Sequence, residues 1–315
     1  MGVIFVKHIE VSGLYKRFGD VNAIENLNLS IEKGDIFGLL GPNGAGKSTT
    51  INILCQLLEK DRGSIKICNE ELRRNDANIR GKLGIVPQDL AIFEDMTALE
   101  NTMFFGSLYG LRGKDLKEKA LKALEFVGLE DTKKLSKTFS GGMKRRLNIA
   151  CGIVHNPELL ILDEPTVGID PQSRNHIMKS IKFLNKNGCT IIYTTHYMEE
   201  VEAICNNVAI IDKGKVIASG SKESLKAIIT DKNKFEVMVN DITEIDEKEL
   251  IDIKGIDSVE FKDNKIIVSI DREINGLNEF ILYLSSKSIK ILDIKSKALT
   301  LEDVFLNLTG RKLRD

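Results

Sequence analysis

Short apolar runs alternate with segments of helical periodicity over about the first 230 residues of the chain. Lys47–Leu58 follows a glycine-rich turn and is predicted to be helical, and Asp115–Val127 has apolar residues at helical spacing. Strands that alternate with helices indicate an α/β domain. Five apolar runs, each bounded by Gly, Pro, Asp or His, are predicted to be its buried strands: Ile36–Leu40, Leu83–Val86, Leu159–Leu162, Thr190–Thr195 and Val208–Ile211.

A further helix is expected after Thr97, because Thr97-Ala-Leu-Glu100 has the pattern of a capping box ahead of an apolar run. The continuation, Met103–Leu111, is unusually apolar for a surface segment. Two interpretations stay open: the segment packs in the core, or it forms a docking face for another protein.

The pattern changes after about Ile229, where Asp231–Lys234 is predicted to be a hydrophilic linker. The last helix is expected to begin near Thr300 and to end at Gly310. Between the linker and this helix, short strands alternate with helices; the strands are Phe235–Val239, Lys265–Ile270 and Ile289–Ile294. We therefore expect two domains, residues 6–229 and residues 235–315, of which the second is a small α+β domain.

Composition narrows the class of protein. Of the 315 residues, Lys+Arg 45 and Asp+Glu 46 give a formal net charge of -1, and 42% are hydrophobic. These values exclude intrinsic disorder and give no electrostatic case for binding nucleic acid. No stretch approaches the ~18 consecutive apolar residues of a membrane-spanning helix. Charged residues within Met1–Glu10 argue against a signal peptide.

The cysteines and histidines show no pattern of a metal or disulfide site. The five cysteines are scattered singly without a CxxC pair, and the four histidines lack ligand spacing. Small buried thiols in a reducing cytosol are the better interpretation. We expect a soluble cytosolic protein of two parts.

A phosphate site is predicted at Gly41-Pro-Asn-Gly-Ala-Gly46-Lys47-Ser48, which fits the pattern G-x-x-x-x-G-K-[ST] between a strand and a helix. The glycines let successive N–H groups converge at the positive end of the helix, which favours phosphate oxygens. Lys47 would reach the β- and γ-phosphates, Ser48 would ligate Mg²⁺, and Thr49 adds a hydroxyl. The alternative is a glycine-rich turn that carries a lysine by chance, and the flanking strand and helix disfavour it.

Leu159–Glu164 is an apolar run that ends in two carboxylates. A buried strand would deliver Asp163 to a metal ion, directly or through water, and would place Glu164 to polarise an attacking water as a general base. Two acids after a strand are more often a helix N-cap, but the phosphate loop favours the catalytic interpretation. Together the two motifs indicate hydrolysis of a nucleoside triphosphate.

A second anion site is expected at Ser140–Gly142. Ser140 is a natural N-cap for the helical stretch Leu147–Val154, yet three cations, Lys144–Arg146, crowd the first turn, where the helix dipole disfavours positive charge. A local cost of this kind is expected where function overrides stability, and the cations would help to hold an anion. One chain cannot easily bring both anion sites to one phosphate, so a dimer is implied.

With these motifs in place, Val6–Ile229 resembles the nucleotide-binding subunit of an ATP-binding cassette (ABC) transporter. The resemblance implies an α/β P-loop NTPase cassette that uses ATP and Mg²⁺, with a RecA-like core, an antiparallel β subdomain and a helical signature subdomain. Leu159–Glu164 resembles the family's Walker B motif. The loop resembles Walker A, which implies these nucleotide-binding residues: Gly41, Asn43, Gly44, Ala45, Gly46, Lys47, Ser48 and Thr49.

The resemblance also implies roles for residues outside these two motifs. Gln88 matches the Q-loop glutamine, which senses Mg²⁺ and the attacking water. His196 matches the switch histidine at the γ-phosphate, and Asp170 resembles the D-loop aspartate at the dimer interface. Phe18 falls where the family stacks an aromatic ring on adenine, with Tyr15 as the competing choice. The implied catalytic residues are Glu164, His196 and Gln88. The implied Mg²⁺ ligands are Ser48, Gln88 and Asp163.

The segment that opens the second anion site resembles the family's signature motif, which contacts the γ-phosphate held by the opposite subunit. The matching residues are Ser140, Gly141 and Gly142. Met143 replaces the common glutamine after the glycines, and Phe139 replaces the usual leucine before the serine. Because Glu164 is present as well, a homodimer would have two competent sites.

The tail Ala298–Gly310 resembles that of ATPases that serve ABC-2-type exporters of drugs, antibiotics or sodium. It also fits an amphipathic helix that packs on its own domain. Since no segment spans a membrane, the partner would be a separate integral-membrane permease docked near Met103–Leu111, with this chain peripheral on the cytoplasmic face. A charge at Phe104 or Phe105 is then expected to uncouple transport while it spares basal ATPase activity.

Two alternatives to an exporter ATPase are disfavoured. A soluble ABC ATPase that acts on ribosomes or DNA is disfavoured by the single cassette and by a pI near 6.5. An ATPase of an importer is disfavoured by the resemblance of the tail. In this arrangement the ATPase touches nucleotide and permease, so no residue here encodes the transported substrate.

Overall fold

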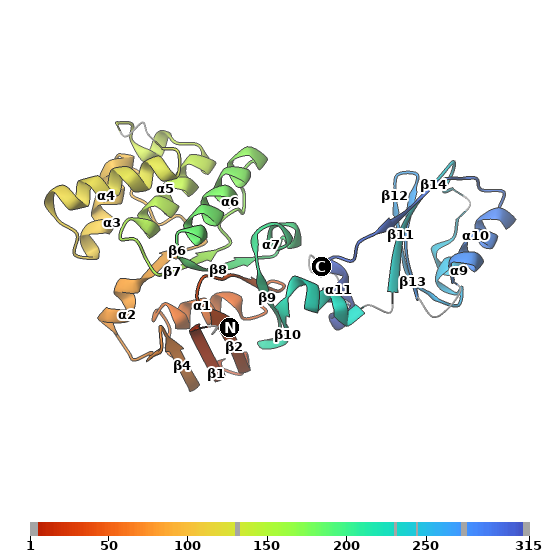
Figure 1. Cartoon of the computed structure of the whole chain (residues 1–315), viewed down its shortest axis with the longest axis horizontal. Coiled ribbons are helices and arrows are strands. Elements are labelled where there is room, and N and C mark those ends of the chain that lie inside the picture. The colour runs from red at the N-terminus through yellow and green to blue at the C-terminus, as the bar shows by residue number, and fades with distance from the viewer. Residues whose placement is uncertain (1–5, 130–132, 230–231, 244, 272–275, 311–315) are drawn as a thin grey trace, which may run out of the picture. The chain divides into compact units, whose positions relative to one another are not determined.

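The structure, a computed structural model, describes residues 6–129, 133–229, 232–243, 245–271 and 276–310 (Figure 1). The chain divides into two compact units, the first extending to Lys222 and the second beginning at Glu223. Each unit has its own hydrophobic core. No helix within the described ranges is both long enough and apolar enough to cross a membrane.

The first unit is built around a six-stranded sheet of order β10-β9-β3-β8-β7-β6, parallel from β9 to β6. Its strands are β3 (Ile36–Leu40), β6 (Leu83–Val86), β7 (Leu159–Asp163), β8 (Thr190–Thr195), β9 (Asn207–Asp212) and the antiparallel β10 (Lys215–Ser221). All five strands predicted from apolar runs are confirmed. Every residue of β3 and β8 is buried, as expected of parallel strands covered on both faces. Because parallel strands point the same way, the segments that follow β3, β6, β7 and β8 meet at one edge.

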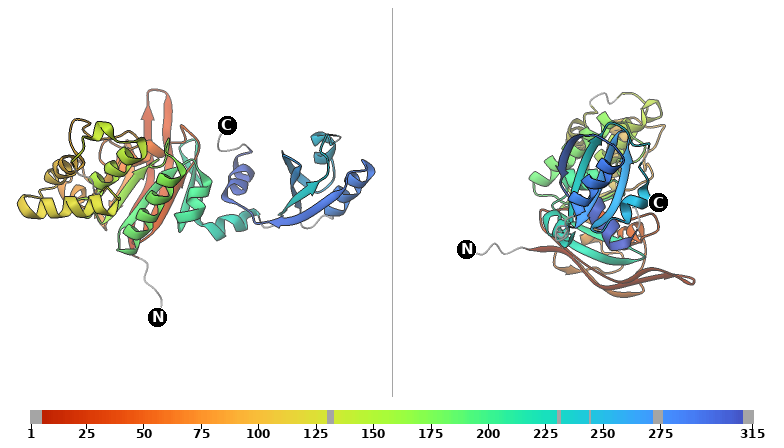
Figure 2. Two further views of the ribbon diagram at one scale, coloured as in Figure 1. Left: turned by 90° about the horizontal axis from the view of Figure 1, so that it is seen from above. Right: turned by 90° about the vertical axis from the view of Figure 1, so that its right-hand side faces the viewer.

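An antiparallel sheet of order β2-β1-β4-β5 forms a second layer of this unit. Its strands are β1 (Lys7–Phe18), β2 (Val21–Glu32), β4 (Arg62–Ile67) and β5 (Glu70–Glu71). Figure 2 shows β1 and β2 as a long two-stranded ribbon. One apolar cluster joins the layers, with Ile9 and Leu27 from this sheet, Leu39 and Ile161 from the parallel sheet, and Ile51 from the first helix.

The helices of the first unit are α1 (Lys47–Leu54), α2 (Ala77–Lys82), α3 (Ala98–Leu108), α4 (Gly113–Phe126), η1 (Ser136–Thr138), α5 (Gly141–Ile153), α6 (Pro171–Lys186) and α7 (Met198–Ile204). Helices α3, α4 and α5 pack against one another (Figure 1). Thr97 caps α3 through a reciprocal capping box with Glu100, as predicted. The predicted end of α1 at Leu58 is wrong: the helix ends at Leu54, because Gln56 has a positive φ of 60°.

The second unit is an α+β structure, as predicted. Its antiparallel sheet has the order β12-β13-β11-β14, and its elements follow the sequence βαββαβ of ferredoxin-like folds. After α8 (Lys222–Lys226), which lies at the division, the elements are η2 (Ala227–Ile229), β11 (Lys232–Val239), α9 (Glu247–Ile251), β12 (Ile256–Lys262), β13 (Lys265–Asp271), α10 (Gly276–Ser286), β14 (Ile291–Lys297) and α11 (Leu301–Thr309). Val237, Val268, Phe280 and Leu284 lie in its core.

The linker predicted at Asp231–Lys234 is wrong for its described part. Strand β11 begins at Lys232, and the charge of Lys234 is neutralised by an ion pair with Asp303 of α11. Asp231 lies outside the described residues. Helix α11 begins after Thr300 and ends at Gly310, which has a positive φ of 69°, as predicted.

Strand β12 was not predicted from the sequence. Its pairing with β13 shifts register between Ile256 and Ser258, so the apolar residues Ile256, Val259 and Phe261 do not alternate regularly. Because regular alternation is the main sequence signal of a half-buried strand, this irregularity conceals the element.

Candidate active site

The loop between β3 and α1 has the geometry of an anion cradle. A Cβ atom added at Gly41 would lie 2.3 Å from the carbonyl oxygen of Ile211, and one added at Gly46 would lie 2.7 Å from that of Ala23. Gly46, with φ 105°, is the N-cap of α1, and no side chain caps this helix or places an acid in its first turn. The first N–H groups of α1 therefore remain available to an anion.

The side chain of Lys47 packs against the carbonyl groups of this loop. Its side chain is only 5% exposed, and Nζ donates to the carbonyl oxygens of Gly41 at 2.7 Å and Pro42 at 3.1 Å. Burial lowers the pKa of Lys47 from its usual value, although Glu164 and Asp163 oppose the shift. Nζ also lies 4.0 Å from Oε1 of Glu164, so the predicted lysine and general base do meet.

The two acidic residues at the end of β7 are held by the end of β8, Asp163 through its carboxylate and Glu164 through its backbone. Oδ1 of Asp163 accepts a hydrogen bond of 2.5 Å from the Thr194 hydroxyl. The backbone N–H of Glu164 donates to the same hydroxyl oxygen at 2.9 Å and to the Thr194 carbonyl at 3.2 Å. Glu164 has a positive φ of 45°, a strained conformation for a residue with a side chain. Sequence reasoning missed Thr194, whose signal is a pair of hydroxyl residues at the end of an apolar strand.

Glu164 also contacts the residue that follows β8. Its side chain is 8% exposed, and Oε1 lies 3.3 Å from Nδ1 of His196. A carboxylate shielded from bulk water, with a cation and an imidazole beside it, can accept a proton from a water at the edge of the sheet. Lys47 and Glu164, predicted from their motifs, and His196, implied by the resemblance, thus lie together.

Gln88 lies on the loop after β6, with its side chain exposed. Its carbonyl oxygen accepts a 2.7 Å hydrogen bond from Arg145, which also donates to the Pro87 carbonyl at 3.0 Å. The start of α5 therefore holds the main chain of this loop.

Phe18 and Tyr15 are both exposed on β1, and Nζ of Lys16 lies 5.4 Å from the centre of the Phe18 ring.

The segment Ser140–Gly142 forms the exposed start of α5. The Ser140 hydroxyl accepts from the N–H of Met143 at 3.3 Å, which confirms it as the N-cap. Nothing lies within 4 Å of a Cβ added at Gly141, whereas one at Gly142 would lie 2.3 Å from Oγ of Ser173 and 3.2 Å from Oδ2 of Asp170. Gly142 is therefore needed for the close approach of α5 to the start of α6.

Asp170 is the N-cap of α6. Its carboxylate accepts from the N–H of Ser173 at 2.9 Å, and the hydrogen bonds from Ser173 lower the pKa of Asp170. The predicted D-loop residue thus has a structural role in shaping the turn before α6, beside Gly142 of the same chain.

The three cations of α5 do not assist an anion site, contrary to prediction. Lys144 pairs with Glu94, and Arg145 donates to the carbonyl oxygens after β6. Arg146 donates to the carbonyl oxygens of Val127 and Gly128 at 3.1 and 3.0 Å. Helix packing directs these side chains toward the protein, where they compensate for the unfavourable position near the helix N-terminus.

Other groups of polar residues do not extend the site. Among the described residues, His8, Cys68 and Glu158 gather metal-type donor atoms within 4.8 Å of one another. However, Nε2 of His8 lies 2.8 Å from Sγ of Cys68 in a hydrogen bond, closer than the roughly 3.6 Å between two ligands of a tetrahedral zinc ion. This contact favours a hydrogen-bonded pair over a metal centre.

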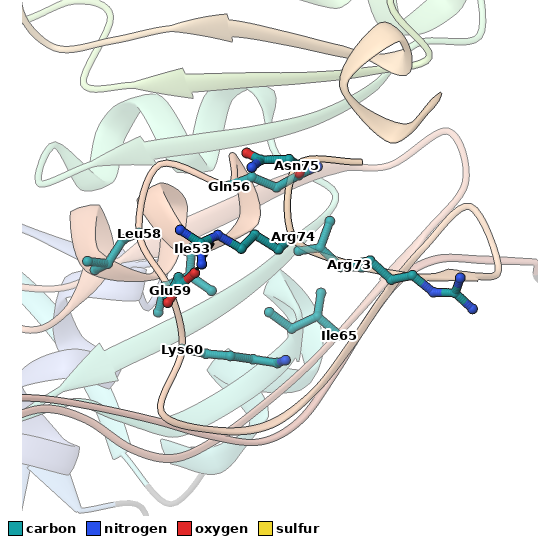
Figure 3. A pocket seen from close by; sticks show the side chains of 10 residues that line it. Ile53, Gln56, Leu58, Glu59, Lys60, Ile65, Arg73, Arg74 and Asn75 are labelled. Atoms are coloured by element: carbon teal, nitrogen blue, oxygen red, sulfur yellow. Dashed lines mark ion pairs between the residues drawn. The ribbon is translucent and has the colours of Figure 1, made fainter. Parts of the chain in front are cut away.

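A cavity of about 230 Å³ lies after α1 and is also separate from the site (Figure 3). Gln56 and Lys60 line it, together with Arg74, whose Nε pairs with Oε1 of Glu59 at 2.9 Å. None of the residues of the phosphate loop or of the carboxylate pair is in its lining.

Comparison with known proteins identifies the family. A family model described as ABC transporter matches residues 24–167. The linearmycin resistance ATP-binding protein LnrL of Bacillus subtilis (strain 168) is 42% identical over 311 residues, covering 98% of this chain and 100% of that protein. The chain belongs to the ABC transporter family. It is an ATP-binding subunit of that family, and its activity is ATP hydrolysis coupled to transport.

Further relatives of this ABC subunit also match over the whole length. The Nod factor export ATP-binding protein I of Cupriavidus metallidurans is 34% identical over 319 residues, covering 98% of this chain and 99% of that protein. The daunorubicin/doxorubicin resistance ATP-binding protein DrrA of Streptomyces peucetius is 34% identical over 311 residues, covering 98% and 94%. These matches include the second unit.

Solved ABC cassettes share the fold of the first part of the chain. A dimeric cassette in a post-hydrolysis state with ADP and Pi is 27% identical with a TM-score of 0.62, covering 68% of this chain and 98% of that one. A nucleotide-free cassette from an ABC transporter is 25% identical with a TM-score of 0.65, covering 72% and 96%. The P-loop NTPase cassette expected from the sequence is confirmed.

Proposed function

We propose that this chain drives export through a separate ABC-2-type membrane permease. The observation that carries the proposal is the extent of the similarity: relatives named for resistance and export match 98% of the chain, including the second unit, whereas the solved cassettes match 68% and 72%. The second unit is thus a feature shared with exporter ATPases. The comparisons favour neither a ribosome- or DNA-directed ATPase nor an importer ATPase.

In this proposal the residues at the carboxyl edge of the parallel sheet carry out the hydrolysis of ATP. The N–H groups of the phosphate loop and Lys47 hold the β- and γ-phosphates, and Glu164 accepts a proton from the attacking water. His196, beside Glu164, contacts the γ-phosphate, and Phe18 or Tyr15 stacks on adenine. Ser48, Gln88 and Asp163 are oxygen donors of the type that Mg²⁺ prefers, and the ion would neutralise charge on the phosphates.

We further propose that two copies of the chain close on ATP as a homodimer. Ser140, Gly141 and Gly142 would meet the γ-phosphate bound by the partner, because the exposed start of α5 offers N–H groups and a hydroxyl. Asp170, which packs beside Gly142, would lie at the same interface.

The homodimer is tested by sizing the full chain with a Glu164→Gln substitution. With Mg²⁺ and ATP this variant is expected to elute as a dimer, because it holds ATP without cleaving it. A Lys47→Met variant, which lacks the phosphate contact, should remain monomeric under the same conditions. A persistent monomer of the Glu164→Gln variant would contradict the homodimer.

A groove beside the Q-loop supports permease docking near Met103–Leu111. This cavity of about 570 Å³ is lined by Leu57, Pro87, Phe105, Leu108 and others, and Leu57 and Leu108 are 71% and 66% exposed. Arg145 joins Pro87 to the start of α5, so a segment of the permease in this groove would contact the loop that α5 holds.

The packing of the residues in and beside the groove determines which variant best tests export. Phe104 packs against the rings of Phe93 and Phe105, at 4.9 and 5.5 Å between centroids, so a charge there also disturbs packing. Leu108→Glu is expected to abolish transport and to spare basal ATPase activity, whereas Leu121→Glu, at an exposed leucine of α4 outside the groove, should spare both. The permease is first identified by affinity capture from membranes. Unchanged transport in the Leu108→Glu variant would exclude this groove as the docking site.

The same docking would place the chain on the cytoplasmic face of the membrane as a peripheral subunit. Fractionation with and without the captured permease tests this location. Retention on membranes that lack the permease would contradict it.

A further inference from the structure

A buried carboxylate lies behind the active site, on helix α7. Glu200 is 2% exposed, and its Oε2 accepts three hydrogen bonds, from the hydroxyls of Thr166 at 2.8 Å, Tyr193 at 2.8 Å and Thr195 at 3.1 Å. Burial of a charge is costly unless hydrogen bonds or a counter-ion compensate it. One oxygen of Glu200 therefore joins the segment after β7 to strand β8.

The other oxygen of Glu200 faces helix α6. Oε1 lies 3.4 Å from Nε of Arg174, and both atoms are buried without a hydrogen bond to any described residue. Arg174 lies in the first turns of α6, whose N-cap is Asp170, and α6 packs against α7 (Figure 1). A shift of a few tenths of an ångström would bring this pair into hydrogen-bond range.

The loop of His196 is held from both sides by the same group of residues. Thr195, which donates to Glu200, accepts at its hydroxyl oxygen from the N–H of Tyr197 at 3.0 Å. The guanidinium of Arg174 lies 5.2 Å from the centre of the Tyr197 ring. Of the two residues that flank His196, Thr195 contacts Glu200 and Tyr197 contacts Arg174, the counter-ion of Glu200. A movement of α6 would therefore change the 3.3 Å contact between His196 and Glu164.

We propose that Glu200 is a positioning residue for ATP hydrolysis. Its ion pair with Arg174 links the start of α6, next to Asp170, to the loop that carries His196. A change at Asp170 when two cassettes meet then alters the position of His196 against Glu164 without any contact between Glu200 and nucleotide. The proposal rests on the ATPase activity of the chain.

Steady-state ATP hydrolysis by the full chain tests this link. The variants are Glu200→Gln, which keeps the volume and an acceptor oxygen, Arg174→Met, Arg174→Lys and the double variant Glu200→Gln/Arg174→Met. Lys179→Met, at an exposed position of α6, removes one positive charge from the same helix and serves as the matched control. Thermal unfolding of each variant is measured alongside.

Glu200→Gln and Arg174→Met are each expected to lower kcat about tenfold while KM for ATP stays within about twofold, even where breaking the buried pair lowers the unfolding temperature. The double variant should be no slower than the slower single variant, and Arg174→Lys should recover part of the rate. Lys179→Met should match the wild type.

Wild-type kcat in Arg174→Met would overturn the proposal, as would losses that multiply in the double variant or a rise in KM that parallels a lower unfolding temperature. Because Arg174 is partly exposed, its variants carry the test even if Glu200→Gln does not fold. Failure of the ATPase assignment is distinguishable, since the wild-type chain would then show no hydrolysis at all.

Discussion

The two units of the chain differ in whether they bury charged residues. In the first unit Lys47, Glu164 and Glu200 are buried at or behind the carboxyl edge of the parallel sheet. In the described part of the second unit, Ser269 is the only buried polar residue, and the ion pairs of Glu236 with Lys265 and Lys297 lie at partly exposed side chains.

The difference indicates that catalysis determines which residues are buried at the active-site edge of the first unit, whereas packing determines it in the second unit. Buried charges oppose folding unless they are compensated, so a protein retains them where function requires them. The second unit instead follows the ordinary rule of apolar residues inside and charges outside. Substitutions of the buried charged residues at this edge should therefore change rate more than stability, and substitutions in the core of the second unit should do the reverse.

The largest effect is expected for Lys47→Met. Removal of a preorganised donor at the phosphates should lower ATP hydrolysis about 100- to 1000-fold, while the unfolding temperature changes little because the methylene chain is retained. Phosphate release and thermal unfolding measure the two properties. Lys33→Met, at an exposed lysine, is the control and should leave both unchanged. Hydrolysis by Lys47→Met near the wild-type rate would show that the buried charge serves the fold.

The converse experiment is Phe280→Ala in the core of the second unit. Phe280 is fully buried, so the cavity should cost that unit about 3–5 kcal/mol of stability. Hydrogen exchange in β13 should rise while ATP hydrolysis remains within about twofold of the wild type. Leu282→Ala, at an exposed residue of the same helix, should do neither. A parallel loss of hydrolysis would remove the distinction between the two units.

A smaller effect, on stability alone, is expected from His155 in the first unit. Burial lowers its pKa from 6.5 to about 4, although its hydrogen bond to the Leu83 carbonyl opposes the shift, and its ring stacks on Tyr109. The unfolded chain therefore binds a proton between pH 6.5 and 4 that the native chain excludes. Stability from this group is present above pH 6.5 and falls by about 2 kcal/mol at pH 5.

Urea unfolding at pH 7.5 and pH 5 checks this sign for the wild type and for His155→Gln. The variant should lose about 2 kcal/mol less than the wild type on acidification, since the amide does not titrate. Equal losses in the two proteins would show that other groups control the acid response.

The active-site edge is predictable because its motifs are local. The phosphate loop is recognised from consecutive residues that follow a buried strand. Asp163 and Glu164 are recognised from their position at the end of another apolar strand. Parallel strands then bring these segments to one edge, together with His196, which only the family resemblance assigns. Chain order and elementary geometry were sufficient for the phosphate loop and the two acidic residues.

Contacts between distant segments were not predictable in the same way. Thr194 bonds the carboxylate of Asp163 and the backbone N–H of Glu164, and Glu200 joins Thr166 to Arg174, but these partners are separated in the sequence and share no motif. The cations Lys144–Arg146 show the same limit: their place near a helix N-terminus suggested an anion, whereas packing of α5 directs them to carbonyl oxygens and to Glu94.

The central claim is that Glu164 activates the attacking water while Lys47 and the phosphate loop hold ATP. The most direct measurement incubates the full-length Glu164→Gln variant with Mg²⁺ and ATP, removes free nucleotide, and quantifies the ATP and ADP that remain bound. The account predicts bound, uncleaved ATP in the variant and ADP in the wild type, because the amide keeps the volume of the side chain but cannot accept the proton. Formation of ADP by the variant at the wild-type rate would contradict it.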